Sequence, residues 1–271
     1  MKETIPLIQV DAFSDRPFCG NPAAVCVTSK ALPDSLMQHI AAEMNLAETA
    51  FLVREENGFH LRWFTPTTEV ELCGHATLAS AHVLWEKGLL PPNEPASFRT
   101  LSGELTAKRE GDDIVLDFPA KPASELEAEE VRSLFPGLKI HLLGKSDYDY
   151  LVVLEDEAAL IELHPDLNRM AEIDARGVIV TARSASSAYD YISRFFAPAC
   201  GVNEDPVTGS AHCTLAPYWS GVLGRKALTG YQASARGGYV GTEYLGERVK
   251  LKGKAVTVMR AEMLVPKFEQ E

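Results

Sequence analysis

Hydrophobic and polar positions alternate in some stretches of the chain and recur at helical spacing in others, which predicts both strands and helices along the chain. Strands are expected at 7–13 and, after the turn residues Gly20-Asn21-Pro22, at 23–27. A helix is expected over 33–44, where the apolar residues fall on one face. The other elements expected in this half are strands at 48–53, 58–64, 97–108 and 113–118 and an acidic helix around 124–127.

The second half of the chain repeats this order of elements. A helical pattern at 160–170 lies between stretches that are typical of strands. Those strands are expected at 141–144, 149–154, 177–181, 189–196, 231–240, 248–251 and 255–264. Two glycines, Gly237 and Gly238, interrupt one of them and indicate a bulge or a close approach of two backbones.

One segment of the chain occurs twice, in two similar copies. An aromatic strand that ends at a proline (62–66 and 194–198) is followed by a polar loop, a Gly-X-Ala turn and an apolar helix, expected at 75–90 and 210–223. A helix that is apolar nearly all round should be central and covered by sheet. The repeat therefore predicts two similar domains, 1–120 and 121–259, with one site between the two halves. The sequence leaves open whether the final strand, at 260–271, joins the first domain.

Charge and composition exclude several classes of function. The net charge of −12, without any basic run, argues against binding to nucleic acid but permits a small anionic substrate. No apolar run approaches the roughly 18–20 residues of a membrane span, and the start of the chain has no signal-peptide pattern, so the cytoplasm is expected. Five cysteines without a CxxC pair indicate free thiols. The Cys and His spacings form no recognised ligand set, so no metal is expected.

The two Gly-X-Ala turns are candidate binding elements. Gly74-His75-Ala76 and Gly209-Ser210-Ala211 place unpaired backbone N–H groups at helix N-termini, which attract carboxylates, and glycine lets a ligand approach closely. His75 should be neutral there, and Asp205 lies in the loop before the second turn. Asp205 and Ser210 can instead be helix caps, and His75 a packed core residue. The symmetric placement in the two halves favours the functional interpretation.

Glu48 begins a strand whose two faces are both largely apolar. A carboxylate in that position is either desolvated or opens onto a cavity, and desolvation raises a carboxyl pKa toward the range useful for proton transfer. The alternative is an exposed glutamate at the end of a strand. Other catalytic motifs are missing: Ser210 is not in a G-x-S-x-G motif, and the sequence has neither a GxGxxG nor a Walker A loop.

Five motifs in order resemble the phenazine-biosynthesis (PhzF-like) isomerase family over nearly the whole chain. They are Val10-Asp11-Ala12-Phe13, Gly20-Asn21-Pro22-Ala23, the segment 45–51 (NLAETAF), Cys73-Gly74-His75-Ala76-Thr77 and the segment 204–211 (EDPVTGSA). The resemblance implies the diaminopimelate-epimerase fold: two similar α+β domains, each a barrel-like, mostly antiparallel sheet around a central apolar helix, with the active-site cleft between them. It implies a cofactor-independent enzyme, usually a homodimer. It also implies the isomerisation of a small carboxylated, cyclic substrate, which in the phenazine enzyme is trans-2,3-dihydro-3-hydroxyanthranilate.

The same resemblance implies roles for individual residues. Glu48 matches the glutamate that moves a proton between ring carbons, and His75, Asp205 and Ser210 match residues that hold the substrate or relay protons. The remaining residues of the matched turns are expected to contact the substrate: Asn21, Cys73, Gly74, Ala76, Gly209 and Ala211.

Two other functions stay open at this point. Epimerases of this fold use two cysteines, one before each turn glycine, and this chain has Cys73 at the first position but Thr208 at the second. Threonine is a poor base at neutral pH, so an epimerase would depend on Cys73, whose thiol a helix N-terminus acidifies. The third possibility is a protein that binds a small ligand without turnover, because fold does not determine function.

Overall fold

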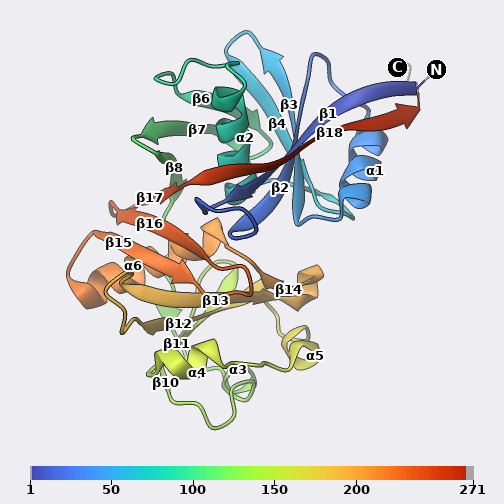
Figure 1. The fold of residues 1–271 in the computed structure, drawn as a ribbon. Coiled ribbons are helices and arrows are strands. Elements are labelled where there is room, and N and C mark those ends of the chain that lie inside the picture. Colours follow the sequence, from blue (N-terminus) through green and yellow to red (C-terminus); the bar gives the residue numbers. More distant parts are fainter. Residues whose placement is uncertain (1, 267–271) are drawn as a thin grey trace. The chain divides into compact units, whose positions relative to one another are not determined.

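The computed structural model describes residues 2–266, and the chain divides into two compact units (Figure 1). The first unit takes the chain as far as Asp117 and again from Gly253 onward, and the second is Phe118–Lys252. No helix in the described part of the chain has both the length and the apolar character of a membrane span.

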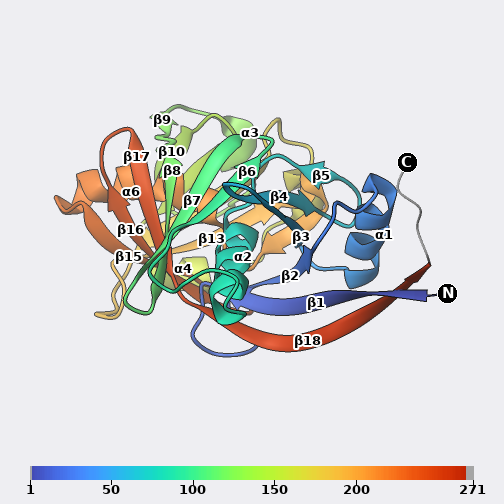
Figure 2. The ribbon, with the colours of Figure 1, turned by 90° about the horizontal axis from the view of Figure 1, so that it is seen from above.

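The first unit contains two helices, α1 (Asp34–Met44) and α2 (Gly74–Glu86). Its strands are β1 (Lys2–Ala12), β2 (Asn21–Thr28), β3 (Glu48–Glu55), β4 (Gly58–Phe64), β5 (Glu69–Val70), β6 (Ala96–Thr100), β7 (Gly103–Glu110), β8 (Asp113–Pro119) and β18 (Ala255–Pro266). The boundary between the units, after Asp117, falls within β8. Strand β1 pairs antiparallel with both β2 and β18, so the last strand runs beside the first (Figure 2). Strands β2 and β3 are parallel, and β3 and β4 are antiparallel.

Helix α2 is the core of the first unit, as its apolar sequence predicts: ten of its thirteen residues are buried. Two of its buried polar side chains bond back to the helix, with Thr77 Oγ1 donating to the Cys73 carbonyl and Ser80 Oγ to the Ala76 carbonyl, so the burial of these two hydroxyls leaves neither donor unsatisfied. Helix α1 covers other strand residues with its Met37 and Ile40 side chains.

The second unit contains one long helix, α6 (Gly209–Leu223), and the short helices α3 (Glu129–Arg132), α4 (Glu157–Ile161), α5 (Leu167–Met170) and η1 (Pro198–Cys200). Its strands are β9 (Ser124–Glu125), β10 (Ile140–Lys145), β11 (Asp149–Leu154), β12 (Gly177–Arg183), β13 (Tyr191–Ala197), β14 (Val202–Asp205), β15 (Ala227–Gln232), β16 (Gly238–Tyr244) and β17 (Arg248–Gly253).

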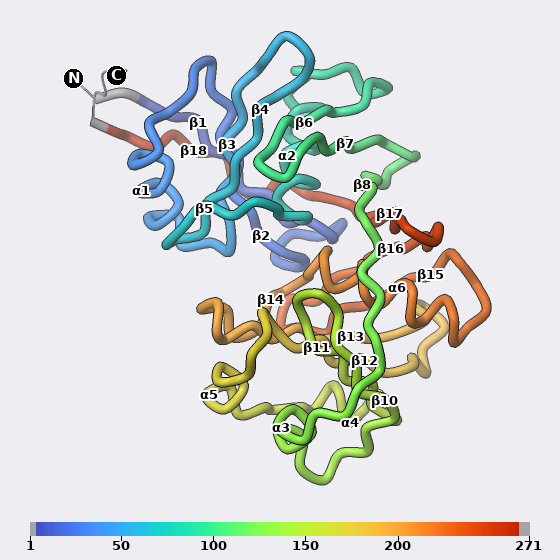
Figure 3. Tube along the Cα trace, turned by 180° about the vertical axis from the view of Figure 1, so that it is seen from behind, coloured from blue at the N-terminus to red at the C-terminus, as the bar shows by residue number. Residues whose placement is uncertain are grey.

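Both faces of this sheet are covered. Leu215 and Trp219 of α6 pack on one face, and residues of α3, α4 and α5 cluster on the other (Figure 3). All six residues of β11 are buried for that reason. Strands β11 and β12 are parallel and β12 and β13 antiparallel, which is the pattern of β2, β3 and β4 in the first unit.

The duplicated aromatic strands also match in their side chains. Arg62 donates from Nε and Nη2 to the Glu69 carboxylate, both at 2.6 Å, and lies over the Phe64 ring. Arg194 donates in the same way to Glu204, at 2.7 and 2.9 Å, and lies over Phe196. The expected α+β class, with an apolar helix against a mostly antiparallel sheet in each of two similar units, is confirmed.

Several of the expected elements differ. The acidic helix at 124–127 is wrong: Ser124 and Glu125 form β9 because their backbone pairs with β10, and the helix α3 begins only at Glu129. The strand expected at 97–108 is two strands, β6 and β7, and the helix expected at 160–170 is the two short helices α4 and α5. The loop after the second aromatic strand contains β14, and the first apolar helix ends at Glu86 rather than near 90.

The expected strand 231–240 is split where its glycines indicated a close approach. Gly237 has a φ of 66°, and a Cβ there would lie 2.3 Å from the Tyr231 hydroxyl, so only glycine fits. The final strand expected at 260–271 is described as β18 up to Pro266, and residues 267–271 lie outside the described part.

Candidate active site

In the first unit, three elements begin near one another and bring their polar side chains together. Because β2 and β3 are parallel, Asn21 at the start of β2 and Glu48 at the start of β3 lie at the same edge of the sheet. Helix α2 begins at this edge with Gly74 and His75. Asn21 and His75 are buried, and the Glu48 side chain is 19% exposed.

His75 is the centre of this cluster. Its Nδ1 lies 3.3 Å from Asn21 Nδ2 and 3.5 Å from Cys73 Sγ, and its Nε2 lies 3.3 Å from Glu48 Oε2. The contact with Glu48 is not aligned as a hydrogen bond, so Nε2 is a buried polar atom without a hydrogen-bond partner in residues 2–266. Such an atom normally finds a partner, and a ligand group beside Glu48 would supply one.

Burial lowers the pKa of His75 from 6.5 to about 3, so its ring is neutral at physiological pH. The Asn21 amide and the Cys73 thiol both offer hydrogens to Nδ1, and this favours the tautomer in which Nδ1 accepts and Nε2 carries the proton. The arrangement therefore directs an N–H group and a carboxylate toward the same point.

Glu48, Cys73 and His75 each offer a possible metal-ligand atom, and these atoms lie within 4.8 Å of one another. The carboxylate lies at Nε2 and the thiol at Nδ1, on opposite sides of the imidazole ring. One ion bound to one ring nitrogen would need a side chain to turn before it met all three. The geometry suits an acid–base pair better than a metal site.

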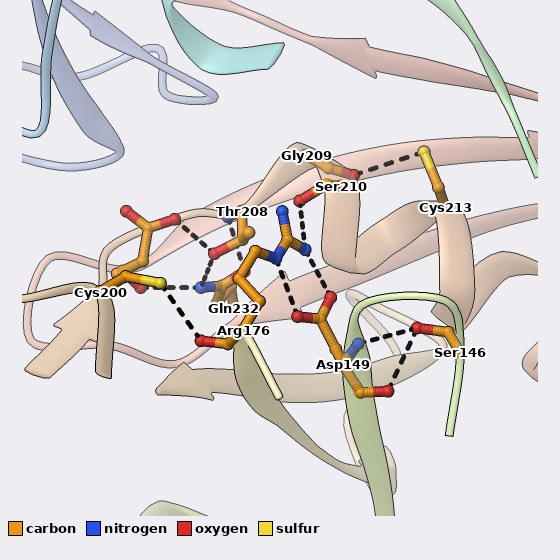
Figure 4. A network of polar contacts seen from close by, with 10 residues as sticks. Ser146, Asp149, Arg176, Cys200, Thr208, Gly209, Ser210, Cys213 and Gln232 are labelled. Carbon is orange, nitrogen blue, oxygen red and sulfur yellow. Dashed lines mark hydrogen bonds and ion pairs between the residues drawn. The ribbon is translucent and has the colours of Figure 1, made fainter. Parts of the chain in front are cut away.

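In the second unit, Asp205 and the start of α6 are held by a network around Gln232 (Figure 4). The Thr208 backbone N–H donates to Gln232 Oε1 at 2.9 Å, and Gln232 Nε2 donates to the Asp205 carbonyl at 2.8 Å. Thr208 Oγ1 donates to Asp205 Oδ2, so the carboxylate is held by the side chain of the residue at which α6 is capped. Gln232 is fully buried, which makes this loop a rigid support.

Ser210, the second residue of α6, accepts a hydrogen bond at 3.0 Å from Arg176 Nη2 (Figure 4). Arg176 also donates to both carboxylate oxygens of Asp149, from Nε at 2.9 Å and again from Nη2. Asp149 is 1% exposed and is itself fixed by Ser146, whose hydroxyl accepts its backbone N–H at 3.1 Å. The start of α6 thus carries a hydroxyl and an anchored guanidinium.

The structure brings Glu48, His75, Cys73 and Asn21 together in the first unit, and it places Asp205 and Ser210 at the same helix start in the second. The turn residues Gly74 and Ala76 lie in the first turn of α2, and Gly209 and Ala211 in the first turn of α6. Three polar residues at the second site were not predicted from the sequence: Asp149, Arg176 and Gln232. Asp149 and Gln232 stand at strand ends and Arg176 just before a strand, positions at which sequence does not distinguish them from surface residues.

The phenazine biosynthesis-like protein family model matches residues 10–261. A protein named uncharacterized isomerase from Halalkalibacterium halodurans is 51% identical over 97% of this chain and 99% of its own length. A crystal structure of a phenazine biosynthesis PhzF family protein from Enterococcus faecalis aligns with a TM-score of 0.91 and 41% identity, covering 96% of this chain and 99% of that one.

A more distant structure shows how far the fold extends. A hydroxyproline epimerase from Agrobacterium vitis aligns with a TM-score of 0.60 over 96% of this chain and 92% of its own, at 10% identity. At that identity the likeness concerns the fold alone, and it agrees with the diaminopimelate-epimerase-like fold expected from the sequence.

Proposed function

Because the chain belongs to the phenazine biosynthesis-like (PhzF) family, whose members include proteins named isomerases, we propose that it is a cofactor-independent isomerase that moves a proton on a small carboxylated, cyclic substrate. The observation that carries this proposal is the pair formed by Glu48 and the neutral, buried His75, whose Nε2 lies 3.3 Å from the carboxylate.

In the proposed reaction, Glu48 acts alone as acid and base. Its carboxylate removes a proton from one carbon of the substrate, the electron pair shifts along the conjugated system, and the protonated Glu48 returns the proton to another carbon. No net charge is gained or lost, and the enzyme ends in its starting state. The neutral Nε2–H of His75 donates to the substrate group that gains electron density during the transfer.

The other candidate residues bind the substrate in this proposal. The N-terminal amides of α2 and α6, around Gly74-His75-Ala76 and Gly209-Ser210-Ala211, offer hydrogen bonds to its polar groups. Asn21 fixes the His75 ring, and Ser210 and Asp205 orient the substrate. Asp205 is suited to a hydroxyl or amino group because carboxylates accept hydrogen bonds.

One contact favours an epimerase as a second candidate. Cys73 Sγ lies 3.5 Å from His75 Nδ1, and a thiol beside an imidazole can become a base. The corresponding residue before Gly209 is Thr208, whose hydroxyl donates to Asp205, so no second thiol is available at the position where an epimerase of the two-cysteine type needs one. This asymmetry favours the one-base mechanism.

The test is incubation of the protein in D2O with trans-2,3-dihydro-3-hydroxyanthranilate and a panel of small amino and hydroxy acids, followed by proton NMR. We expect rearrangement or deuterium uptake that is lost in Glu48→Gln and kept in Cys73→Ala. Full turnover by Glu48→Gln would refute the role of Glu48. Loss in Cys73→Ala with formation of a stereoisomer would support the epimerase. Binding without exchange would support a binding protein.

We also propose that the protein works in the cytoplasm and that it is a homodimer, of which the dimer is what the family resemblance implies. Light scattering coupled to size-exclusion chromatography tests the dimer: a mass near twice the 29.6 kDa of one chain supports it, and the mass of one chain refutes it.

A further inference from the structure

The registers of the two units show which residue of the second corresponds to Glu48. In the first unit Thr49 of β3 pairs with Phe64, and in the second unit Val178 of β12 pairs with Phe196. Phe64 and Phe196 occupy the same position of the duplicated aromatic strand, two residues after the paired arginine. Glu48, one residue before Thr49, therefore corresponds to Gly177.

The second unit has no room for a side chain at this position. A Cβ on Gly177 would lie 2.6 Å from Phe195 Cζ and 2.6 Å from the Phe196 carbonyl oxygen. The preceding residue instead sends its side chain to the helix start: Arg176 Nη2 donates to Ser210 Oγ at 3.0 Å. Ser210 and His75 are both the residue between the glycine and the alanine of their turns. One unit thus presents a carboxylate beside this residue, and the other presents a guanidinium.

The guanidinium of Arg176 is held rigidly. Two of its nitrogens bond to the buried Asp149, and its Cζ lies 5.5 Å from the centres of the Tyr148 and Phe195 rings. Its backbone N–H donates to the Tyr148 carbonyl at 2.9 Å. A planar cation fixed by so many contacts loses little further freedom when it binds an anion.

Arg194 shows what a structural arginine looks like in this same unit. Its Nε and Nη2 bond to Glu204, and its Nη1 donates to the carbonyls of Leu160 and Leu163, so all three nitrogens are used. Arg176 differs at Nη1, which has no partner among the residues that the structure describes. Its side chain is also 36% exposed, against 11% for Arg194. In Figure 4, Nη1 points away from Asp149 toward the start of α6.

We propose that Arg176 binds the carboxylate of the substrate through Nη1, together with the Ser210 hydroxyl and the N-terminal amides of α6. This inference rests on the proposed function and deepens it, because it assigns the acidic group of the substrate to the second unit. The pair of Glu48 and His75 then remains free for the proton transfer.

The test compares the binding of anthranilate and of anthranilamide, which differ in the carboxylate alone, by calorimetry on the full chain. Removing Arg176 alone leaves the buried Asp149 unpaired, so the main variant is the double change Arg176→Gln with Asp149→Asn, which removes both charges. Arg194→Gln with Glu204→Gln is the matched control, an ion pair in the same unit whose cation has no open nitrogen. Circular dichroism confirms that each variant is folded, and Arg176→Lys keeps the charge if the double variant does not fold.

We expect the wild type to bind anthranilate in preference to the amide. Loss of a charge-assisted hydrogen bond should weaken anthranilate binding by roughly 10–100-fold in the double variant and leave the amide unchanged. The anthranilate affinity of Arg176→Lys should lie between that of the wild type and that of the double variant, because lysine keeps the charge but cannot make the same planar contact. The control pair should keep the wild-type preference.

The proposal is overturned if the wild type does not bind anthranilate or does not discriminate, or if the Arg176 variants keep the full preference. Deuterium exchange by Glu48 is measured separately on the same proteins. Exchange with no Arg176-dependent preference would sustain the proposed function and reject this inference. An Arg176-dependent preference for anthranilate without deuterium exchange would support this inference and reject the proposed function.

Discussion

His212 makes the stability of the second unit depend on pH. It lies in α6, is fully buried, and its Nδ1 is 2.8 Å from the Tyr191 hydroxyl. Burial lowers its pKa from 6.5 to about 3, with an opposing contribution from a hydrogen bond to Gln232. We consider the substitution His212→Asn, which removes the titrating ring and keeps an acceptor near the position of Nδ1.

The sign follows from proton binding in the two states. The unfolded chain takes up a proton as the pH falls through about 6.5, and the folded protein does so only near pH 3, so acid favours unfolding. For one such group, the free energy of unfolding falls by about 2 kcal/mol between pH 7 and pH 5, since each unit of pH below 6.5 costs about 1.4 kcal/mol. The loss ends as the pH reaches the native pKa.

The assay is urea unfolding of the wild type and of His212→Asn at pH 8, 7, 6 and 5. Tryptophan fluorescence follows the unfolding. Trp219 contributes the signal of the second unit, because it lies in the same helix as His212 and its Nε1 donates to Thr181 Oγ1, whereas Trp63 and Trp85 lie in the first unit. We expect the stability difference between wild type and variant to shift by about 2 kcal/mol in favour of the variant from pH 7 to pH 5. Contributions of the other histidines cancel in this difference. Between pH 7 and 8 it should stay constant, and a difference independent of pH from 8 to 5 would refute the reasoning.

Three further predictions test other parts of the structure. The ring nitrogens of His75 should keep the 15N NMR shifts of a neutral imidazole at pH 5, because burial holds its pKa near 3; shifts of an imidazolium would contradict this. Gly177→Ala should lower the free energy of unfolding by about 1–3 kcal/mol in urea, through overlap with Phe195 and Phe196, whereas Gly221→Ala in α6, where the new methyl meets nothing within 4 Å, should be neutral or stabilising. Thr181→Val should cost about 1–3 kcal/mol by leaving Trp219 Nε1 without its acceptor, and an unchanged urea midpoint would show that another acceptor replaces it.

Periodicity predicted most strands and all three long helices because these elements have an apolar face of fixed period. It failed where the partner of a segment is distant in the sequence. The local sequence at Ser124 and Glu125 predicts the start of a helix, but pairing with Gly144 and Lys145 makes these residues a strand. The helix and strand propensities of neighbouring residues contain no information about a partner that is distant in the sequence.

The proline inside α6 is a second case in which a distant partner decides. Pro217 has no N–H to donate to the Cys213 carbonyl four residues earlier. The Lys121 N–H donates to that carbonyl instead, at 3.0 Å, so the helix continues through the proline without an unsatisfied acceptor. The sequence predicts the helix from its apolar residues, but only the fold shows why the proline is tolerated.

The candidate site was predictable in part for the same reason. His75, Asp205 and Ser210 stand at helix starts that glycine and proline mark in the sequence, and Glu48 interrupts an apolar strand. No glycine, proline or apolar pattern in the sequence distinguishes Arg176 or Gln232. Their roles depend on which side chains the fold brings to the start of α6, and these come from segments 24 and 34 residues away.

The duplication separates structural polar residues from those that can differ in function. Arg62 with Glu69 and Arg194 with Glu204 occupy the same positions and make the same two-pronged contact, so selection for the fold explains both. Glu48 and Gly177 occupy one equivalent position, and His75 and Ser210 another, yet their chemistry differs. Residues that only support the repeated fold are expected to be alike at equivalent positions of the two units. The divergence at the two helix starts therefore marks residues that the repeated fold alone does not explain: a carboxylate beside His75 in the first unit and a guanidinium beside Ser210 in the second.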